Sequence, residues 1–136
     1  MEAHFQLSDQ EFERQFAFCQ LDPSLFSHEA HLRLAWIHIQ QHGQEQAEIN
    51  IQKQLQDFVA SVGATDKYHA TLTVAAVRIV GHFIKTSSAE TFSQFMEEYP
   101  RLKTAFKGLV EQHYSFDIFQ SAEARATFLA PDLLAF

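Results

Sequence analysis

The sequence predicts an all-α fold, a single-domain helical bundle of about six or seven helices over residues 1–136. Three observations favour this class. No segment alternates polar and apolar residues with the period of two that is typical of half-buried strands. Apolar residues instead recur at spacings of three and four, and helix caps and stop residues separate these runs. Helices joined by short turns pack as antiparallel neighbours, which favours a bundle.

The first two helices are defined by signals at their ends. Ser8 and Glu11 form a capping box for a helix over about residues 9–19. Ser27 is the N-cap of a second helix, which runs to Gly43 as its C-terminal stop. Both caps stand directly before runs of apolar residues at helical spacing, so the two helices are expected to bury one face each.

The next two helices follow after short turns. The third covers about residues 45–62 and ends at Gly63. Thr65 or Asp66 is expected to cap the fourth, over about residues 67–85. The turns around the two glycines are short, so the second, third and fourth helices should run up, down and up.

The last three helices are shorter. The fifth opens near Ser88 and Thr91 and stops before Pro100. Proline is favoured at a first helical position, so Pro100 also starts the sixth helix, which is expected to reach about His113. Ser121 starts a short seventh helix.

The composition is that of a folded domain with an acidic surface. Hydrophobic residues make up 46% of the chain, including 14 Phe, against only 4 Gly and 3 Pro. A chain of this length buries about two thirds of its unfolded surface, so it can form a core. The 17 acidic residues outnumber the 10 basic ones, and no Lys/Arg cluster is present. Nucleic acid is therefore not expected as a partner.

The sequence also predicts a soluble, cytoplasmic protein that does not cross a membrane. Cys19 is the only cysteine, so an intrachain disulfide is excluded, as is usual in a reducing compartment. The first fifteen residues contain no apolar signal-peptide core. The most apolar stretch, LTVAAVRIV, contains Arg78 and is too short to span a bilayer.

The histidines of the second helix form a stripe. At about 100° per residue they fall between two apolar arcs of the helical wheel, so they are expected to face inward. The residues on the opposite, solvent-facing arc should be Glu29, Arg33 and Gln40. The stripe consists of His28, His31, His38 and His42.

His69 and Thr73 lie in the middle of the apolar arc of the fourth helix, where polar and small residues among large ones indicate a concavity. The up–down–up course places the start of this helix at the same end of the bundle as the start of the second. The sequence therefore predicts that His28, His31 and His69 converge in a pocket between these two helices.

Two ligand chemistries suit such a pocket. Imidazoles from two helices are common metal ligands, so His28, His31 and His69 could hold a divalent ion, with Zn, Fe and Ni not distinguished. The positive ends of two helices would instead favour a small polar or anionic ligand. For the metal, a fourth ligand could come from Asp22, Asp132 or Cys19.

For the anionic ligand, the binding residues would be Lys67, Tyr68, Thr71 and Thr73. In either case His31 and His69 are the candidates for acid–base catalysis, because imidazole titrates near neutral pH. The alternative is a non-catalytic interaction or structural protein whose buried histidines only form internal hydrogen bonds. The sequence leaves enzyme activity and the formation of a homo-oligomer open.

Other features favour structural roles. HIQQH, residues 38–42, has the spacing of zinc peptidases but lacks their glutamate, so His42 is interpreted as a residue that interacts with the helix dipole. Cys19 is expected to be buried and inert. Trp36 should lie at the polar border of its helix. A series of phenylalanines is expected in the core: Phe92, Phe95, Phe106, Phe116 and Phe119.

The segments FSHEAHLRLAW and KYHATLT, followed by HYS and a terminal PDLL, resemble a family of small uncharacterised bacterial all-α proteins. Members of that family share a paired-histidine segment, HxxHL, and a later KYHxT segment. The resemblance covers most of the chain. It implies no activity, but it groups His28, His31, Lys67, Tyr68, His69 and Thr71 as a unit.

Overall fold

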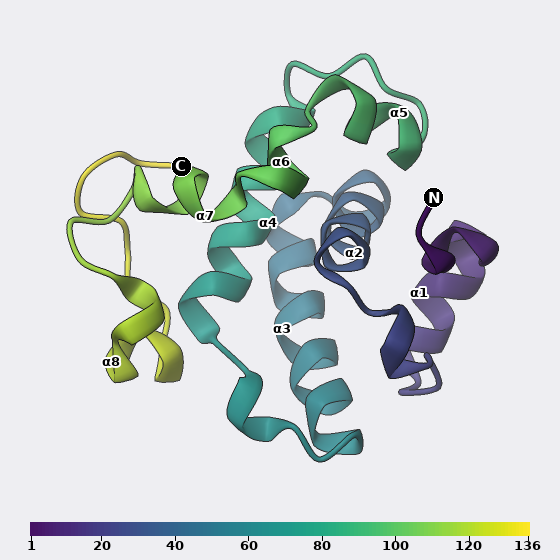
Figure 1. Cartoon of the computed structure of the whole chain (residues 1–136), viewed down its shortest axis with the longest axis horizontal. Helices are drawn as coiled ribbons and strands as arrows, with labels where there is room; N and C mark the ends of the chain where they lie inside the picture. Colours follow the sequence, from purple (N-terminus) through teal and green to yellow (C-terminus); the bar gives the residue numbers. More distant parts are fainter. The chain divides into compact units, whose positions relative to one another are not determined.

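The computed structural model describes residues 1–136 and is entirely helical, with eight α-helices, four short 3₁₀ helices (η) and no strand. The chain forms two compact units, Met1–Tyr68 and His69–Phe136 (Figure 1). The first unit contains η1 (Ala3–Gln6), α1 (Asp9–Ala17), η2 (Pro23–Leu25), α2 (His28–His42), α3 (Gln44–Ser61) and η3 (Thr65–Lys67). The second contains α4 (Ala70–Ile84), α5 (Phe92–Glu98), α6 (Arg101–Thr104), α7 (Phe106–Glu111), η4 (Ile118–Gln120) and α8 (Ala122–Ala126).

The helix ends predicted from the sequence are largely confirmed. The hydroxyls of Ser8, Ser27, Thr91 and Ser121 each accept a hydrogen bond from the backbone N–H three residues on. Each bond satisfies one of the N–H groups that a helix start leaves without a partner. Gly43, with a φ of 82°, separates α2 from α3, which requires the left-handed backbone that glycine adopts easily.

The core of the first unit forms where α1 and α2 pack on α3. Phe16 of α1 is fully buried, and its ring lies 4.8 Å from that of Phe26 and 4.9 Å from that of Phe58. Stacked rings at this separation add to the free energy gained by burying their area. The buried face of α2 includes Leu32, Leu34 and Ile37, so this helix is covered on most of its circumference.

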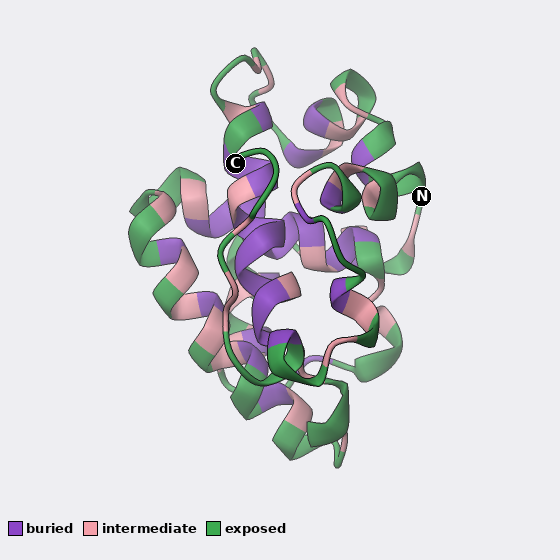
Figure 2. Ribbon diagram, turned by 90° about the vertical axis from the view of Figure 1, so that its left-hand side faces the viewer, coloured by how far each residue is buried: buried purple, intermediate pink, exposed green.

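The second unit is organised around α4, whose valines and alanines are almost fully buried. Both α7 and α8 contact α4. Phe95 and Leu102, from α5 and α6, are completely buried. Buried residues form continuous patches on the helices, whereas the connecting segments are mostly exposed (Figure 2).

The helix count exceeds the prediction because the expected sixth helix is two helices. Ala105, with φ −137° and ψ 32°, interrupts it between α6 and α7. The hydroxyl of Thr104 donates to the carbonyl oxygen of Pro100, a back-bond that often bends a helix. The fourth helix also starts later than predicted. Thr65 and Asp66 belong to η3, and His69 is the cap of α4.

Several burial predictions were wrong. Glu29 and Arg33, expected to face solvent, are only 6% and 4% exposed, because the segment before α1 covers that side of α2. Trp36 is buried rather than at a polar border. Phe116 is 40% exposed and so lies outside the core. Cys19 is only half-buried, at a left-handed φ of 57° just after α1.

Candidate metal centre

The paired histidines at the start of α2 differ in environment. His28 is exposed, whereas the ring of His31 packs against that of Phe26 at 5.5 Å. His31 is half-buried, but its Nε2 atom is fully covered and has no hydrogen-bond partner. Burial, with a smaller contribution from the nearby His28, lowers the pKa of His31 to about 4. His31 is therefore neutral at physiological pH.

His69 is the N-cap of α4. Its Nδ1 atom accepts a hydrogen bond of 3.0 Å from the backbone N–H of Leu72, and its Nε2–H donates one of 2.9 Å to the carbonyl oxygen of Ile118. These two bonds set the tautomer of a residue that is only 6% exposed. His69 would have to release one of them to ligate a metal ion.

The other residues predicted to bind a ligand lie in varied surroundings. Lys67 is exposed and Tyr68 is half-buried, at the end of the first unit. Thr71 is fully buried; its hydroxyl donates to the carbonyl oxygen of Thr127 and accepts from the N–H of Leu129. Thr73 donates to the carbonyl oxygen of His69. The two threonine hydroxyls therefore have internal partners, so they contribute to the packing of the second unit.

The predicted convergence joins His28 and His31 of the first unit to His69 of the second, and it stays a prediction. Among the proposed fourth ligands, the carboxylate of Asp22 accepts from the backbone N–H of Ser24. The carboxylate of Asp132 accepts from the backbone N–H of Ser115. Both side chains thus also serve as caps of local turns.

We expect replacement of His69 by alanine to lower the free energy of unfolding by about 2–3 kcal/mol. The variant loses a helix cap and leaves the carbonyl oxygen of Ile118 without its donor. His69→Asn restores the cap but not the second bond, so it should recover about 1 kcal/mol. Urea unfolding of the three proteins measures both values, and equal stability of the two variants would contradict the capping role.

A different group of side chains has the spacing of a metal site. Glu13 of α1 and His38 and His42 of α2 each offer one ligand atom, and these atoms all lie within 4.8 Å of one another. The two histidines are one helical turn apart, with ring centroids 5.6 Å from each other. Nε2 of His42 lies 3.7 Å from Oε1 of Glu13. Two imidazoles and one carboxylate are a ligand set suited to first-row transition metals.

His38 is the buried member of this group. The residue is 1% exposed, and its Nε2 atom has no hydrogen-bond partner. Burial is the main cause that lowers the pKa of His38; the charge of Glu13 opposes this shift and His42 adds to it. A neutral imidazole is the form that binds a metal ion. Buried polar atoms are usually hydrogen-bonded, so a covered nitrogen without a partner is available to bind an ion. Nε2 of His31 is a second such atom.

The second nitrogen of His38 faces a polar neighbour. Its Nδ1 atom lies 3.5 Å from the amide nitrogen of Asn50 on α3. The amide oxygen of Asn50 accepts a hydrogen bond of 2.8 Å from the side chain of Gln46. A metal-binding histidine usually donates the N–H opposite the metal to an acceptor that orients the ring, so the amide of Asn50 would have to turn its oxygen toward His38 to take this role.

A second group with suitable spacing, Glu2, His4 and Glu29, is already occupied by protein groups. Nε2–H of His4 donates to Oε1 of Glu29 at 2.7 Å, and Glu2 accepts from the hydroxyl of Ser27. The guanidinium of Arg33 lies 3.3 Å from Nδ1 of His4. A buried cation this close opposes binding of another, so this group is a structural network rather than a metal site.

Sequence reasoning missed the Glu13–His38–His42 group although it singled out the histidine spacing. HIQQH lacks a glutamate at the peptidase position, and His42 was therefore interpreted as a dipole residue. The carboxylate comes instead from α1, twenty-five residues before His38. The available signal was the inward orientation of the histidine stripe, but nothing in the sequence indicates which residue of α1 faces it.

No helix of the chain is both long and apolar enough to cross a membrane. Comparison with family models, with curated proteins and with solved structures found no match. The resemblance to a family with HxxHL and KYHxT segments therefore stays a prediction.

Proposed function

We propose that this protein binds a divalent transition-metal ion at Glu13, His38 and His42. The observation that supports this most strongly is that a ring nitrogen of the buried His38 lies within 4.8 Å of the ligand atoms of the other two side chains. The Nε2 atom of the same ring has no hydrogen-bond partner. Zinc, iron and nickel all accept two imidazoles and a carboxylate, so this ligand set does not distinguish among the three metals.

The three side chains can close around an ion with modest movement. A tetrahedral ion with bonds of about 2.05 Å holds its ligand atoms roughly 3.3 Å apart, so the largest separation has to shrink by about 1.5 Å. The side chains of His42 and Glu13 are 38% and 22% exposed and have room to rotate toward His38. His38 then provides the fixed ligand and the other two adapt to it.

Three protein ligands leave at least one coordination position for water or a small ligand, as in catalytic rather than structural metal sites. Glu13 also borders a shallow surface groove of about 570 Å³, lined further by Gln10, Arg14, Phe18 and Gln41. The groove provides access from solvent beside the proposed ion. An ion with such an open position could support a metal-dependent reaction. Metal binding itself is tested first.

The test is a calorimetric titration of Zn²⁺ into protein that has been treated with chelator. We expect one site, and stabilisation of about 2.7 kcal/mol when free Zn²⁺ exceeds its dissociation constant a hundredfold. His42→Ala should weaken binding more than about a hundredfold, because even changes outside the ligand shell cost roughly 10–100-fold. His42 is exposed, so this variant should fold normally.

His28→Ala is the matched control, because it removes an exposed histidine from the first turn of the same helix. It should leave affinity unchanged. Loss of binding in His28→Ala or His31→Ala, but not in His42→Ala, would instead favour the His28–His31–His69 site. Titration with Co²⁺ adds a visible spectrum whose intensity separates tetrahedral from octahedral coordination.

Asn50→Leu tests the orientation of His38. When Nε2 binds the ion, Nδ1 is protonated and needs an acceptor, which Asn50 supplies if its amide and that of Gln46 both rotate by 180°. We expect Zn²⁺ affinity to fall roughly 10–100-fold in this variant, with the binding stoichiometry unchanged. Unaltered affinity would show that Asn50 does not act on the metal site.

A further inference from the structure

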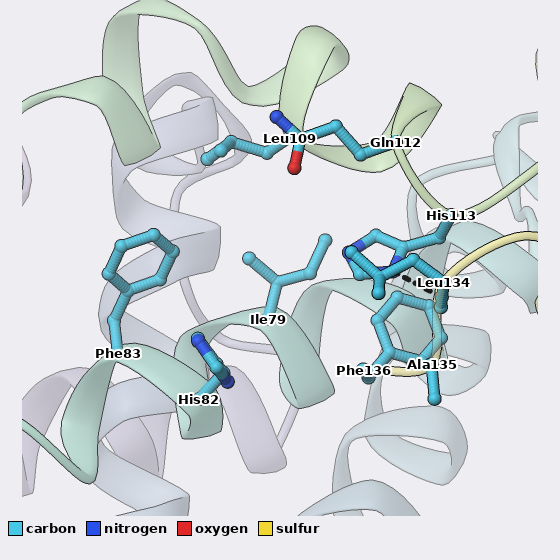
Figure 3. A pocket seen from close by; sticks show the side chains of 9 residues that line it. All are labelled: Ile79, His82, Phe83, Leu109, Gln112, His113, Leu134, Ala135 and Phe136. Atoms are coloured by element: carbon cyan, nitrogen blue, oxygen red, sulfur yellow. Dashed lines mark hydrogen bonds between the residues drawn. The ribbon is translucent and has the colours of Figure 1, made fainter.

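The second unit contains a cavity that is separate from the proposed metal centre. It has a volume of about 230 Å³ and lies between α4 and the end of α7, with the C-terminal residues as a further wall (Figure 3). Most of its lining is apolar and includes two aromatic rings: Ile79, Phe83, Leu109 and Phe136. An apolar cavity of roughly 150 Å³ is large enough for benzene, so this one has room for a bicyclic molecule.

The C-terminal wall is held in place by hydrogen bonds. The carbonyl oxygen of His113 accepts from the backbone N–H groups of Asp132 and Leu133, at 3.2 and 3.1 Å. The carboxylate of Asp132 accepts from both the N–H and the hydroxyl of Ser115. The hydroxyl of Tyr114 donates to the carbonyl oxygen of Leu129 at 2.8 Å. These contacts keep the tail in position, so the cavity is a built feature of the unit.

Three polar side chains line the cavity, His82, Gln112 and His113, and His113 is the one whose ring is fixed by the C-terminal tail. Its Nδ1–H donates to the carbonyl oxygen of Leu134 at 2.6 Å, and in the tautomer that makes this bond Nε2 is an acceptor. No protein group hydrogen-bonds to Nε2. Figure 3 shows the ring of His113 at the cavity wall, with one nitrogen bonded to the tail and the other on the side of the cavity. The ring of Phe136 packs against that of His113 in a tilted arrangement, with the ring centroids 4.4 Å apart.

We propose that this cavity binds a small, planar, largely apolar molecule with one N–H or O–H donor, such as an indole or a phenol. The flat rings of Phe83 and Phe136 and the aliphatic side chains of Ile79 and Leu109 contact its faces. Its donor bonds to Nε2 of His113. The binding of this molecule does not depend on a metal ion, because every lining residue belongs to the second unit.

Indole and 1-methylindole are the probes that test this assignment, because methylation removes the N–H donor and keeps the ring system. In NMR titrations of the full chain we expect indole to shift the resonances of Ile79 and Leu109. Its affinity should exceed that of 1-methylindole about three- to tenfold, the value of one hydrogen bond. Equal affinities for the two probes, or no shift at millimolar indole, would refute the proposal.

Two variants locate the site. His113→Asn keeps a side-chain N–H in the place of Nδ1 for the tail but lacks Nε2, so the preference for indole over 1-methylindole should disappear. Leu109→Trp fills the cavity from a half-buried position and should abolish the binding of both probes. Unchanged affinities in a folded Leu109→Trp protein, checked by circular dichroism, would overturn the assignment, as would a retained preference in His113→Asn.

Discussion

Replacement of Arg33 by methionine should lower the free energy of unfolding by about 3 kcal/mol, because it leaves buried polar groups without their charged donor. The guanidinium donates to the carbonyl oxygens of His4 and Leu7 at 2.7 and 2.8 Å, and to the carboxylate of Asp9 at 2.9 Å. It is only 4% exposed and lies over the ring of Phe12 at 4.8 Å. Methionine fills a similar volume, so the decrease in the free energy of unfolding measures the polar contacts rather than the packing.

The expected loss arises because the buried carbonyl oxygen of His4 cannot find another donor, whereas Asp9 is 48% exposed and can turn to water. Arg33→Lys keeps the charge but has a single donor group, which cannot reach all three acceptors, so its stability should be intermediate. Arg14→Met is the control, since Arg14 is exposed on α1 and its removal should change stability by less than about 0.5 kcal/mol. Urea unfolding of the four proteins gives the values. A loss below about 1 kcal/mol for Arg33→Met would show that the network does not stabilise the fold.

Acid should destabilise the protein through His31. The pKa of His31 is about 4 in the folded chain against 6.5 for a free side chain, so the unfolded chain binds the proton more tightly. The stability that comes from keeping the ring neutral is therefore complete above about pH 6.5 and is lost as the pH falls to 4. A difference of 2.5 pKa units corresponds to about 3 kcal/mol over this range, as an upper value.

His31→Gln tests this directly, because glutamine does not titrate. We expect the stability of the native protein to fall more steeply than that of the variant between pH 6.5 and 4, by up to about 3 kcal/mol over the whole interval. Urea unfolding at half-unit pH steps measures the two profiles. His38, whose pKa is also lowered, should contribute in the same direction in both proteins and so cancel in the difference. Parallel profiles would contradict the burial of a neutral His31.

The local part of the fold was predictable because its signals lie close together in the sequence. Ser8, Ser27, Thr91 and Ser121 cap their helices as expected, and each cap needs only a residue three positions away. The break at Ala105 was not predictable, since alanine is a strong helix former.

The candidate site was predicted in part, because the inward position of His38 also follows from the local periodicity of its helix. The periodicity of α2 placed His38 on an inward face, where the structure buries it. The same reasoning placed Glu29 and Arg33 in solvent, and that failed. A helical wheel describes one helix alone and cannot anticipate that residues 2–7 pack over its polar side.

Taken by itself, the sequence determined that the chain is all-α, where most helices start, and that His38 faces inward; the other predicted inward histidines of α2 include His28 and His42, which are exposed. The tertiary structure decided which groups meet: Glu13 with His38 and His42, Arg33 with the segment before α1, and His113 with the C-terminal tail. The reason is physical. Helix propensity and capping depend on neighbours within one turn, whereas a metal site or a buried ion pair depends on the angle and register at which separate helices pack.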